Sequence, residues 1–526
     1  MKEHCLISST FPIFIFKILL HFRPTPYSIF LPMSRLLLSM LFFLMAAVHT
    51  STAQVQTSIE TSGIISSTDT TPFWFQSNRY GMYAPDGSQF MTRFQYYSNQ
   101  NEVGIFDIQF GADMIARPGN NATLNFNQGY LNIHAYGVEL IAGRFHNTSP
   151  LQDDQLSMGS LGISTNASPI PQIRLGLTDW TPIPFTKEFL KIKGHISHGW
   201  LGSRRYTEDL LLHEKVGHLR VGGNLPINVY AGLAHYVKWG GNHPEYGDIP
   251  TRWSDFKNVF LAYPGDEQTP GPMQTYVLGD HLGAWDFGFF LDIGKTNISL
   301  YRQHPLESRD NLKLKSLQDA LTGILIDLPE TSSLPVRRFL YEYLYTKYQD
   351  GPRRENFGGD LTRDRYRGNE NYYNHGIYRS GWVYNYRTIG NPLFIPSEEN
   401  MGVLNNRIVA HHIGLISNID RAELTMKATF SRNYGKYCDN RVPDLGEGEL
   451  FGVECAEDNW NDNATEFIHT VSGHSVDQWS FLAGMSIPIR FIENQNIRFI
   501  LELAFDNGSL AGDQFGALIG LRWLPR

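Results

Sequence analysis

Residues 103–116 read VGIFDIQFGADMIA, and apolar and polar side chains alternate along this stretch. One set of alternate positions carries Phe106, Ile108, Phe110, Ala112 and Met114, and the other carries Asp107, Gln109, Gly111 and Asp113. Successive side chains of a β-strand point to opposite faces, so the pattern predicts a strand with one apolar and one polar face. The same alternation recurs at 128–135, at 497–506 and in the last expected strand, 514–523.

Strand length favours a membrane barrel over a soluble β-sandwich. Sandwich strands average about 5–6 residues, whereas a strand that crosses a bilayer needs about 9–11, and these stretches are of the longer kind. Tight turns are expected at Tyr136-Gly137, at 293–295 and at 418–420, and long polar connections separate other strands. Short turns at one rim and long loops at the other are typical of an outer-membrane barrel. Such a barrel must close on itself, because lipid satisfies no backbone hydrogen bond.

The strand count carries one internal problem. Alternation alone predicts roughly 14 to 18 strands. If the turns at 293–295 and 418–420 lie at the same rim, an even number of strands must join them. The chain between these turns therefore needs one more membrane-crossing strand than alternation reveals. The segment 389–406 contains Pro392 and Pro396 and therefore cannot be a regular central strand. We predict that this segment passes through the lumen or forms an irregular strand.

Composition excludes other classes of protein. The chain of 526 residues is 42% hydrophobic, 13% aromatic and 18% charged, and its mean hydropathy is -0.28. Beyond residue 48 no apolar run is long enough for a membrane-spanning helix, which excludes a helical transporter. The formal charge of -8 argues against a nucleic-acid partner.

The first 53 residues differ from the rest. An apolar run from Leu36 to Val48 precedes the small residues 51–53, as in a secretory signal, and we expect translation to start at Met33. Two membrane helices or an unusually long signal are the alternative. The expected organisation is an extension and signal peptide at 1–53, removed during Sec-dependent export, and a barrel domain at 54–526. Without residues 1–53, which hold four basic and one acidic residue, the formal charge falls from -8 to -11.

Two cysteines follow the signal, Cys438 and Cys455, in a polar segment. In an exported protein this pair predicts a disulfide within a loop, since a metal site would need more ligands.

Five strings of sequence resemble the capsule assembly protein Wzi family of Gram-negative outer membranes. They are TPFWFQSNRYG at 71–81, RLGLTDWTPIPF at 174–185, KGHISHGW at 193–200, EYLYTKYQDGP at 342–352 and GIYRSGWVYNYRTIGNPLF at 376–394. Their order is that of the family, and the resemblance covers essentially the whole chain after residue 53. The first string contributes the family-motif residues Phe73, Trp74, Asn78, Arg79 and Tyr80, for which packing and glycan contact remain alternatives.

The resemblance implies an all-β fold: a transmembrane antiparallel barrel of eighteen strands with lumen-plugging loops and a small helical element. It also implies a non-catalytic role in attaching or organising capsular polysaccharide. The tail after Trp523 and the extended N-terminus depart from the family pattern.

An arginine-rich connection is the strongest candidate site for polysaccharide. It contains Arg353, Arg354, Arg363, Arg365 and Arg367, followed by Tyr372, Tyr373 and Trp382. Guanidinium groups bind carboxylates through two parallel hydrogen bonds, and aromatic rings pack on sugar faces, so the combination suits an acidic polysaccharide. The alternative is that Glu355, Asp360 and Asp364 pair with these arginines inside a folded plug.

Metal and catalytic sites are not expected. The acidic segment 439–466 could hold Ca²⁺ but spells no known calcium loop, so a solvated loop is favoured. His195 and His198 should lie on opposite faces of a strand, as should His411 and His412. A lipid-modifying enzyme would need residues such as Ser472, Ser475 and His474 to converge.

We therefore predict a monomeric barrel that binds capsular or exopolysaccharide, with no cofactor, no metal and no nucleic acid. Outer-membrane lipid is the expected surrounding partner, and a polysaccharide export complex is a further candidate. The alternative function is a porin or channel for small saccharides.

Overall fold

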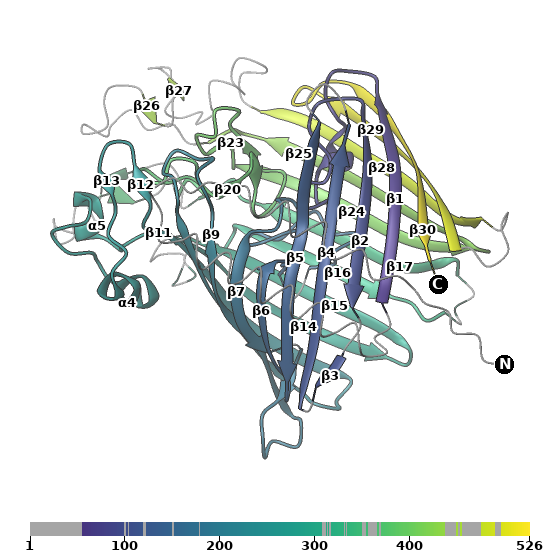
Figure 1. Ribbon diagram of the computed structural model, residues 1–526, viewed down its shortest axis with the longest axis horizontal. Coiled ribbons are helices and arrows are strands. Elements are labelled where there is room, and N and C mark those ends of the chain that lie inside the picture. The colour runs from purple at the N-terminus through teal and green to yellow at the C-terminus, as the bar shows by residue number, and fades with distance from the viewer. Residues whose placement is uncertain are drawn as a thin grey trace, which may run out of the picture. The chain divides into compact units, whose positions relative to one another are not determined.

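A closed wall of β-strands forms the protein (Figure 1). The computed structural model describes residues 55–98, 101–103, 105–118, 122–149, 152–177, 179–307, 312, 314, 317–330, 332, 334–349, 354–355, 366–367, 370–436, 449–450, 453–454, 475–489 and 496–525. The signal-peptide prediction for residues 1–53 and the disulfide prediction for Cys438 and Cys455 lie outside these residues.

The main sheet of the described chain has twenty strands, all antiparallel to their neighbours. Two of them are short, β3 (Asn101–Val103) and β8 (Thr181–Pro182), and pair beside β4 and β9. The other eighteen make the wall, as predicted. They are β1 (Val55–Ser66), β2 (Gln89–Ser98), β4 (Phe106–Arg117), β5 (Thr123–Ala135), β6 (Val138–Arg144), β7 (Pro171–Leu177), β9 (Leu190–Trp200), β10 (Leu211–Val221), β11 (Ile227–Trp239), β14 (Asp280–Ile293), β15 (Thr296–Leu306), β16 (Ala320–Asp327), β17 (Val336–Tyr345), β24 (Ile408–Ile419), β25 (Ala422–Asn433), β28 (Val476–Ile489), β29 (Asn496–Gly508) and β30 (Gln514–Leu524).

The first and last strands close the wall. β1 pairs with β30 from Ile59 opposite Trp523 to Ser66 opposite Gly516. This pairing removes the free sheet edge, which lipid could not satisfy.

The two faces of the wall differ as the alternation predicts. Across three neighbouring strands Phe481, Phe505 and Phe515 stand side by side on the outer face and are exposed. The adjacent positions Ser480 and Asp506 are buried on the inner face. An apolar outer surface and a polar interior are what a barrel in a bilayer requires.

Turn lengths divide the barrel into two rims. The turns at 136–137, 294–295 and 420–421 join consecutive strands at one end, which we call the short-turn rim. The connections at 67–88, 145–170, 240–279 and 346–407 lie at the opposite, long-loop rim. In outer-membrane barrels the long loops face the cell surface.

The predicted extra crossing at 389–406 is wrong. Four strands, β15, β16, β17 and β24, join the turns at 294–295 and 420–421, so parity is satisfied without it. Alternation does not reveal β16 because both of its faces are apolar: Leu321 and Leu325 pack inside, while Ile324 faces outward. The segment 389–406 instead begins and ends at the long-loop rim. It does enter the lumen, as predicted, where Ile389, Phe394 and Val403 are buried.

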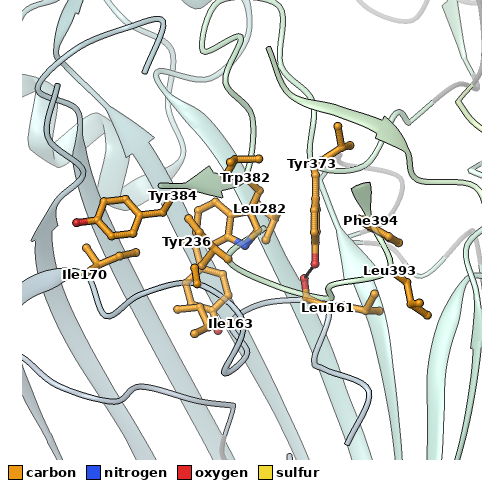
Figure 2. Packing of buried hydrophobic residues seen from close by; sticks show 14 of the residues in the cluster. Leu161, Ile163, Ile170, Tyr236, Leu282, Tyr373, Trp382, Tyr384, Leu393 and Phe394 are labelled. Atoms are coloured by element: carbon orange, nitrogen blue, oxygen red, sulfur yellow. Dashed lines mark hydrogen bonds between the residues drawn. The ribbon is translucent and has the colours of Figure 1, made fainter. Parts of the chain in front are cut away.

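Three long connections fold into the barrel and form a plug. They contain α3 (Phe73–Gln76), the segment 145–170, and the hairpins β20 (Val383–Tyr384) with β21 (Arg387–Thr388) and β22 (Ile395–Pro396) with β23 (Val403–Asn405). Their side chains make one buried cluster with inward-facing wall residues such as Tyr236 and Leu282, part of which Figure 2 shows. The core of this molecule therefore lies inside the barrel.

The connection between β11 and β14 forms a separate insertion at the long-loop rim. It holds β12 (Asn242–His243), β13 (Gly247–Asp248), α4 (Trp253–Leu261) and α5 (Gly271–Thr275), and lies beside the wall in Figure 1. Two further two-stranded pairs are β18 (Arg354–Glu355) with β19 (Tyr366–Arg367) and β26 (Glu449–Leu450) with β27 (Val453–Glu454). No helix in the described part of the chain is long and apolar enough to span a membrane.

Candidate functional site

The family-motif residues anchor the plug to the wall. The Trp74 ring is buried and lies 4.4 Å from the Lys427 Nζ of β25. Asn78 Nδ2 donates to Ser157 O at 3.0 Å, and Arg79 pairs with Glu502 of β29 at 2.5 Å. These contacts join α3 to two wall strands and to the second plug segment.

Tyr80 and Phe73 complete the motif in different ways. Tyr80 stacks on His146 with 3.5 Å between ring centroids, and its backbone has φ 52°. Phe73 is only partly buried, and its ring lines a cavity at the long-loop rim. Of the five family-motif residues, Phe73 is thus the one that lines this cavity.

The predicted aromatic residues of the arginine-rich region lie inside the plug. Trp382 Nε1 donates to Gly162 O at 2.7 Å, and Tyr373 Oη donates to Leu161 O at 2.7 Å, as Figure 2 shows for the second pair. Tyr372 Oη donates to Asp319 Oδ2 at 2.9 Å. All three rings are buried, so their contact with a glycan stays a prediction that requires the plug to open.

The arginines themselves are described only in part. Arg354 and Arg367 oppose each other in the β18–β19 pair. Nothing is described of their side chains, and Arg353, Arg363 and Arg365 lie outside the described residues. Their role in binding polysaccharide therefore stays a prediction.

A cavity of about 320 Å³, lined by both polar and apolar side chains, lies between the plug and the wall, and we call it the rim cavity. Its floor and sides come from α3, from the β20–β21 hairpin, from the following proline-rich segment, and from the inner faces of β25 and β28. Its lining residues are Phe73, Gln76, Ser77, Pro85, Asn166, Asn385, Tyr386, Arg387, Thr388, Pro392, Leu393, Ile395, Pro396, Thr429, Ser431, Gln478, Ser480, Leu510 and Ala511.

Of the side chains that line the rim cavity, only Arg387 carries a charge. Amides and hydroxyls dominate the polar lining, and no carboxylate is part of it. Arg387 donates to Gln76 O at 2.8 Å and to Tyr83 O at 2.5 Å. Burial, helped by the nearby Arg117, lowers the pKa of Arg387 to about 10, so the guanidinium stays charged at neutral pH. The cavity therefore presents a positive charge beside many hydrogen-bonding groups.

The hairpin between β20 and β21 holds an exposed ring in a strained conformation. Its two central residues, Asn385 and Tyr386, have φ of 49° and 62°, as a two-residue turn of this twist requires. Asparagine tolerates this region, whereas a bulky aromatic residue rarely adopts it. Tyr386 is nevertheless 54% exposed at the rim cavity. A residue held in this backbone region beside a cavity is a candidate for ligand contact.

The rim cavity was not predicted from the sequence, although one of the five family strings contributes residues to its lining. Asn385, Tyr386 and Arg387 lie within the string at 376–394. An Asn-Tyr pair between two residues of strand-forming type was the available signal for a turn. The wall residues Thr429 and Gln478 carried no signal, because every inner-face position of a barrel is commonly polar.

The predicted separation of the paired histidines is confirmed. His195 faces inward and contacts Glu214 at 3.2 Å, whereas His198 packs against Phe256 on the outer side. His412 Nε2 donates to Leu156 O inside the barrel, whereas His411 contacts Tyr341 on the outer face. Among the described residues no group of three or more His, Cys, Asp and Glu side chains could hold a metal ion.

Three solved structures are among those similar to this chain. Wzi of Escherichia coli, described as a carbohydrate-binding β-barrel involved in group 1 capsule assembly, is 14% identical, with a TM-score of 0.49 over 97% of this chain and 91% of that chain. OpdL of Pseudomonas aeruginosa is 8% identical, with a TM-score of 0.44 over 90% and 98% of the two chains. OccD3 (OpdP) of the same organism is 9% identical, with a TM-score of 0.42 over 89% and 91%. No curated protein matches the sequence.

A family comparison gives a direct assignment. The sequence model described as capsule assembly protein Wzi matches residues 55–403, more than half of the 526 residues. The match stops before the last five wall strands, so it is shorter than the resemblance predicted from the sequence strings. With its closed strand wall and this match, the chain is an outer-membrane β-barrel that belongs to the capsule assembly protein Wzi family.

Proposed function

We propose that this barrel binds a surface polysaccharide non-covalently at the rim cavity and so assists the assembly or attachment of a capsule. The observation that carries the proposal is the strained, exposed Tyr386 beside a cavity of mixed polar and apolar lining at the long-loop rim. An aromatic face and a ring of amides and hydroxyls match the two faces of a sugar residue. Membership of the capsule assembly family supports a glycan as the ligand.

Charge favours an acidic polymer over a neutral one. Arg387 is a cation in the lining, and no carboxylate of the lining repels an anionic sugar. The arginines at 353–367 precede Arg387 in the same connection of the chain and would extend the cationic surface. We propose that both groups contact the polymer.

Binding without turnover is the second part of the proposal. Hydrolysis of a glycosidic bond generally uses two carboxyl groups on either side of the bond. The lining of the rim cavity contains no Asp, Glu or His. The rim cavity is therefore equipped to hold a sugar chain and not to cleave it.

The porin alternative is disfavoured by the plug. Trp382 contacts Tyr236 of β11 on one side of the interior, and Trp74 contacts Lys427 of β25 on another. Both contacts belong to buried side chains that fill the space through which a solute would pass.

The site is tested by substituting Tyr386→Gly, which removes the ring and relieves the strain of a positive φ. The matched control is Tyr136→Gly, because Tyr136 is also exposed and has φ 52° but lies at the short-turn rim. We expect Tyr386→Gly to weaken binding of oligosaccharides from the strain's own capsule about tenfold, which corresponds to one lost aromatic contact. Isothermal titration calorimetry on the purified barrel measures the dissociation constant of the oligosaccharide for each variant. Equal affinities of the two variants would refute the site.

The arginine-rich connection is tested separately. Replacing Arg363, Arg365 and Arg367 together with Ala is expected to increase the fraction of acidic capsule shed into the medium while the barrel still assembles. The measurement is the ratio of cell-bound to shed polymer. Heat-modifiable migration of the variant in gel electrophoresis is the control for barrel assembly. Unchanged glycan binding by the purified triple variant would count against these arginines.

A further inference from the structure

A second cavity lies on the outer face of the wall, beneath the insertion between β11 and β14. It has a volume of about 560 Å³, and we call it the outer-wall cavity. Lys215, His235 and His281 line it together with Ile196, Leu233 and Ala262. It shares no lining residue with the rim cavity.

Lys215 points away from the barrel interior. Its neighbours Glu214 and Val216 are buried on the inner face, and Glu214 contacts the inward-facing His195. In the sheet Lys215 stands between Ile196 of β9 and His235 of β11, so these three share the outer face. A cation on the lipid-facing side of a barrel is costly unless a partner stabilises it.

The protein supplies only part of that stabilisation. Lys215 Nζ donates to the carbonyl oxygen of Phe260 in α4 and lies 4.6 Å from the Phe260 ring. Within the described part of the chain no carboxylate forms an ion pair with it. The one carboxyl that lines the cavity, that of Glu307, accepts from the backbone N–H of Tyr373 in the plug. An ammonium group has three donors, so Lys215 keeps capacity for an anionic ligand.

The polar side chains of the cavity lie nearer the long-loop rim and its apolar side chains lie nearer the membrane centre, as do the head group and acyl chains of a lipid. Lys215 and His235 are paired at one level of the wall, and His281 lies one step nearer the long-loop rim, opposite Val237. Gly217 and Leu233 form the next outer-face level away from that rim. A head group would thus meet the cation, and an acyl chain would continue along Gly217 and Leu233 toward the membrane centre.

The depth of the cavity fits the outer leaflet. Lys215 is four residues from the rim end of β10, about 13 Å along the strand at 3.3 Å per residue. The insertion that covers the cavity carries exposed aromatic and aliphatic residues, namely Trp253, Leu261, Tyr263 and Tyr276. Such residues concentrate at the membrane–water interface, where phosphate groups of lipids lie.

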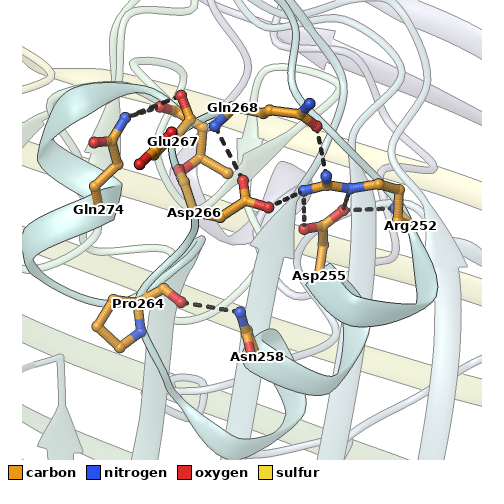
Figure 3. A network of polar contacts seen from close by, with 9 residues as sticks. Arg252, Asp255, Asn258, Pro264, Asp266, Glu267, Gln268 and Gln274 are labelled. Carbon is orange, nitrogen blue, oxygen red and sulfur yellow. Dashed lines mark hydrogen bonds and ion pairs between the residues drawn. The ribbon is translucent and has the colours of Figure 1, made fainter.

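Contacts with the outer wall and within the insertion hold the insertion in place over the cavity. Phe256 and Phe260 pack on His213 of the outer wall at 5.2 and 5.4 Å between ring centroids. Figure 3 shows Arg252 bridging Asp255 and Asp266, which ties the start of α4 to the loop before α5. Asp255 also accepts from the Arg252 backbone N–H at 2.7 Å. The roof of the cavity is therefore fixed without any contribution from a ligand.

We propose that the outer-wall cavity binds a phosphate-bearing lipid of the outer leaflet. Lys215 contacts the phosphate, His235 and His281 border the head group, and one acyl chain lies against Gly217 and Leu233. The proposal rests on the outer-membrane location and does not depend on glycan binding at the rim cavity.

Native mass spectrometry of the full barrel in non-ionic detergent tests the proposal. The probes are dioleoyl phosphatidate, dioleoyl phosphatidylcholine and inorganic phosphate. We expect phosphatidate to bind at least tenfold more tightly than phosphatidylcholine, because the choline cation of phosphatidylcholine cancels the phosphate charge and repels Lys215. Lys215→Met should remove the difference. Lys257→Met is the matched control, because Lys257 is an exposed cation of α4 that does not line the cavity.

A second variant tests the acyl-chain part. A Cβ at Gly217 would meet nothing within 4 Å, so Gly217→Trp is accommodated and fills the cavity while Lys215 remains. We expect it to weaken phosphatidate binding about tenfold while heat-modifiable migration is unchanged. Equal affinity in Lys215→Met and wild type, or equal loss in Lys257→Met, would overturn the proposal. Displacement of phosphatidate by equimolar inorganic phosphate would also overturn it, since the site would then recognise a free anion.

Discussion

At the scale of single residues, Asp319 links the plug to the rim of the wall. Its carboxylate accepts from Tyr372 Oη at 2.9 Å and from the backbone N–H groups of Tyr348 and Gln349 at 3.0 and 2.6 Å. Burial nevertheless raises the pKa of Asp319 to about 6, because these hydrogen bonds offset only part of the cost of desolvation. The folded state therefore binds a proton more tightly than the unfolded chain.

A pH dependence of stability follows from this carboxyl. Because its pKa is raised on folding, its contribution is most favourable below about pH 4 and is lost as the pH rises to about 6. The loss is about 3 kcal/mol. Asp319→Asn cannot ionise and keeps one of the two acceptor oxygens, so its melting temperature should be lower than that of the wild type but should vary less between pH 4 and 7. Thermal unfolding followed by circular dichroism compares the two proteins, and parallel curves would contradict the assignment.

Residue types alone indicated which side chains carry chemistry but not where they lie. The outward and inward positions of 103–116 follow directly from alternation, and the structure confirms them at Phe106 and Asp113. Alternation says nothing of Tyr372 or Trp382, because their burial depends on contacts between segments more than 200 residues apart, such as Trp382 with Gly162. The rim cavity escaped sequence reasoning for the same reason.

At the scale of elements, α4 shows a helix whose apolar face covers a membrane wall. Trp253, Phe256 and Phe260 recur at helical spacing, and this was the signal by which the helix could be predicted. Its partners His213 and Trp239 belong to the outer face, which lipid covers elsewhere. Periodicity predicts such a helix, but which side of the barrel it covers is set by tertiary contacts.

Phe256→Ala should detach α4 from the wall while the barrel remains closed. Phe256 contacts three rings of the outer face, those of His198, His213 and Trp239. Truncation of a partly buried Phe of this kind should cost about 2 kcal/mol of local stability. Limited proteolysis should then cleave within 253–276, and Leu261→Ala, at an exposed position of the same helix, should not increase cleavage. Resistance of Phe256→Ala to the protease would show that α4 is held by other contacts.

At the scale of the whole molecule, the plug converts a barrel wide enough for a channel into a closed surface platform. The wall, its closure and the rims could be predicted because the bilayer demands internal pairing of every backbone group and imposes one pattern on every strand. The plug has no such repeated constraint. The contacts of the plug differ from one segment to the next. For this reason the strand that alternation does not reveal was predicted at 389–406, whereas in the structure it is β16.

The closed state can be tested as a property of the whole barrel. We predict negligible conductance for the wild-type protein in planar lipid bilayers, because the three plug segments contact one another and opposite parts of the wall. Combining Trp382→Ala with Tyr373→Ala removes two rings and their hydrogen bonds to 161–162, which should loosen the plug and give discrete openings. Trp253→Ala, at an exposed position of the outer insertion, should stay closed. Steady conductance by the wild-type barrel would instead favour the porin function, whereas openings confined to the double variant locate the barrier at the contact between the segments 145–170 and 370–407.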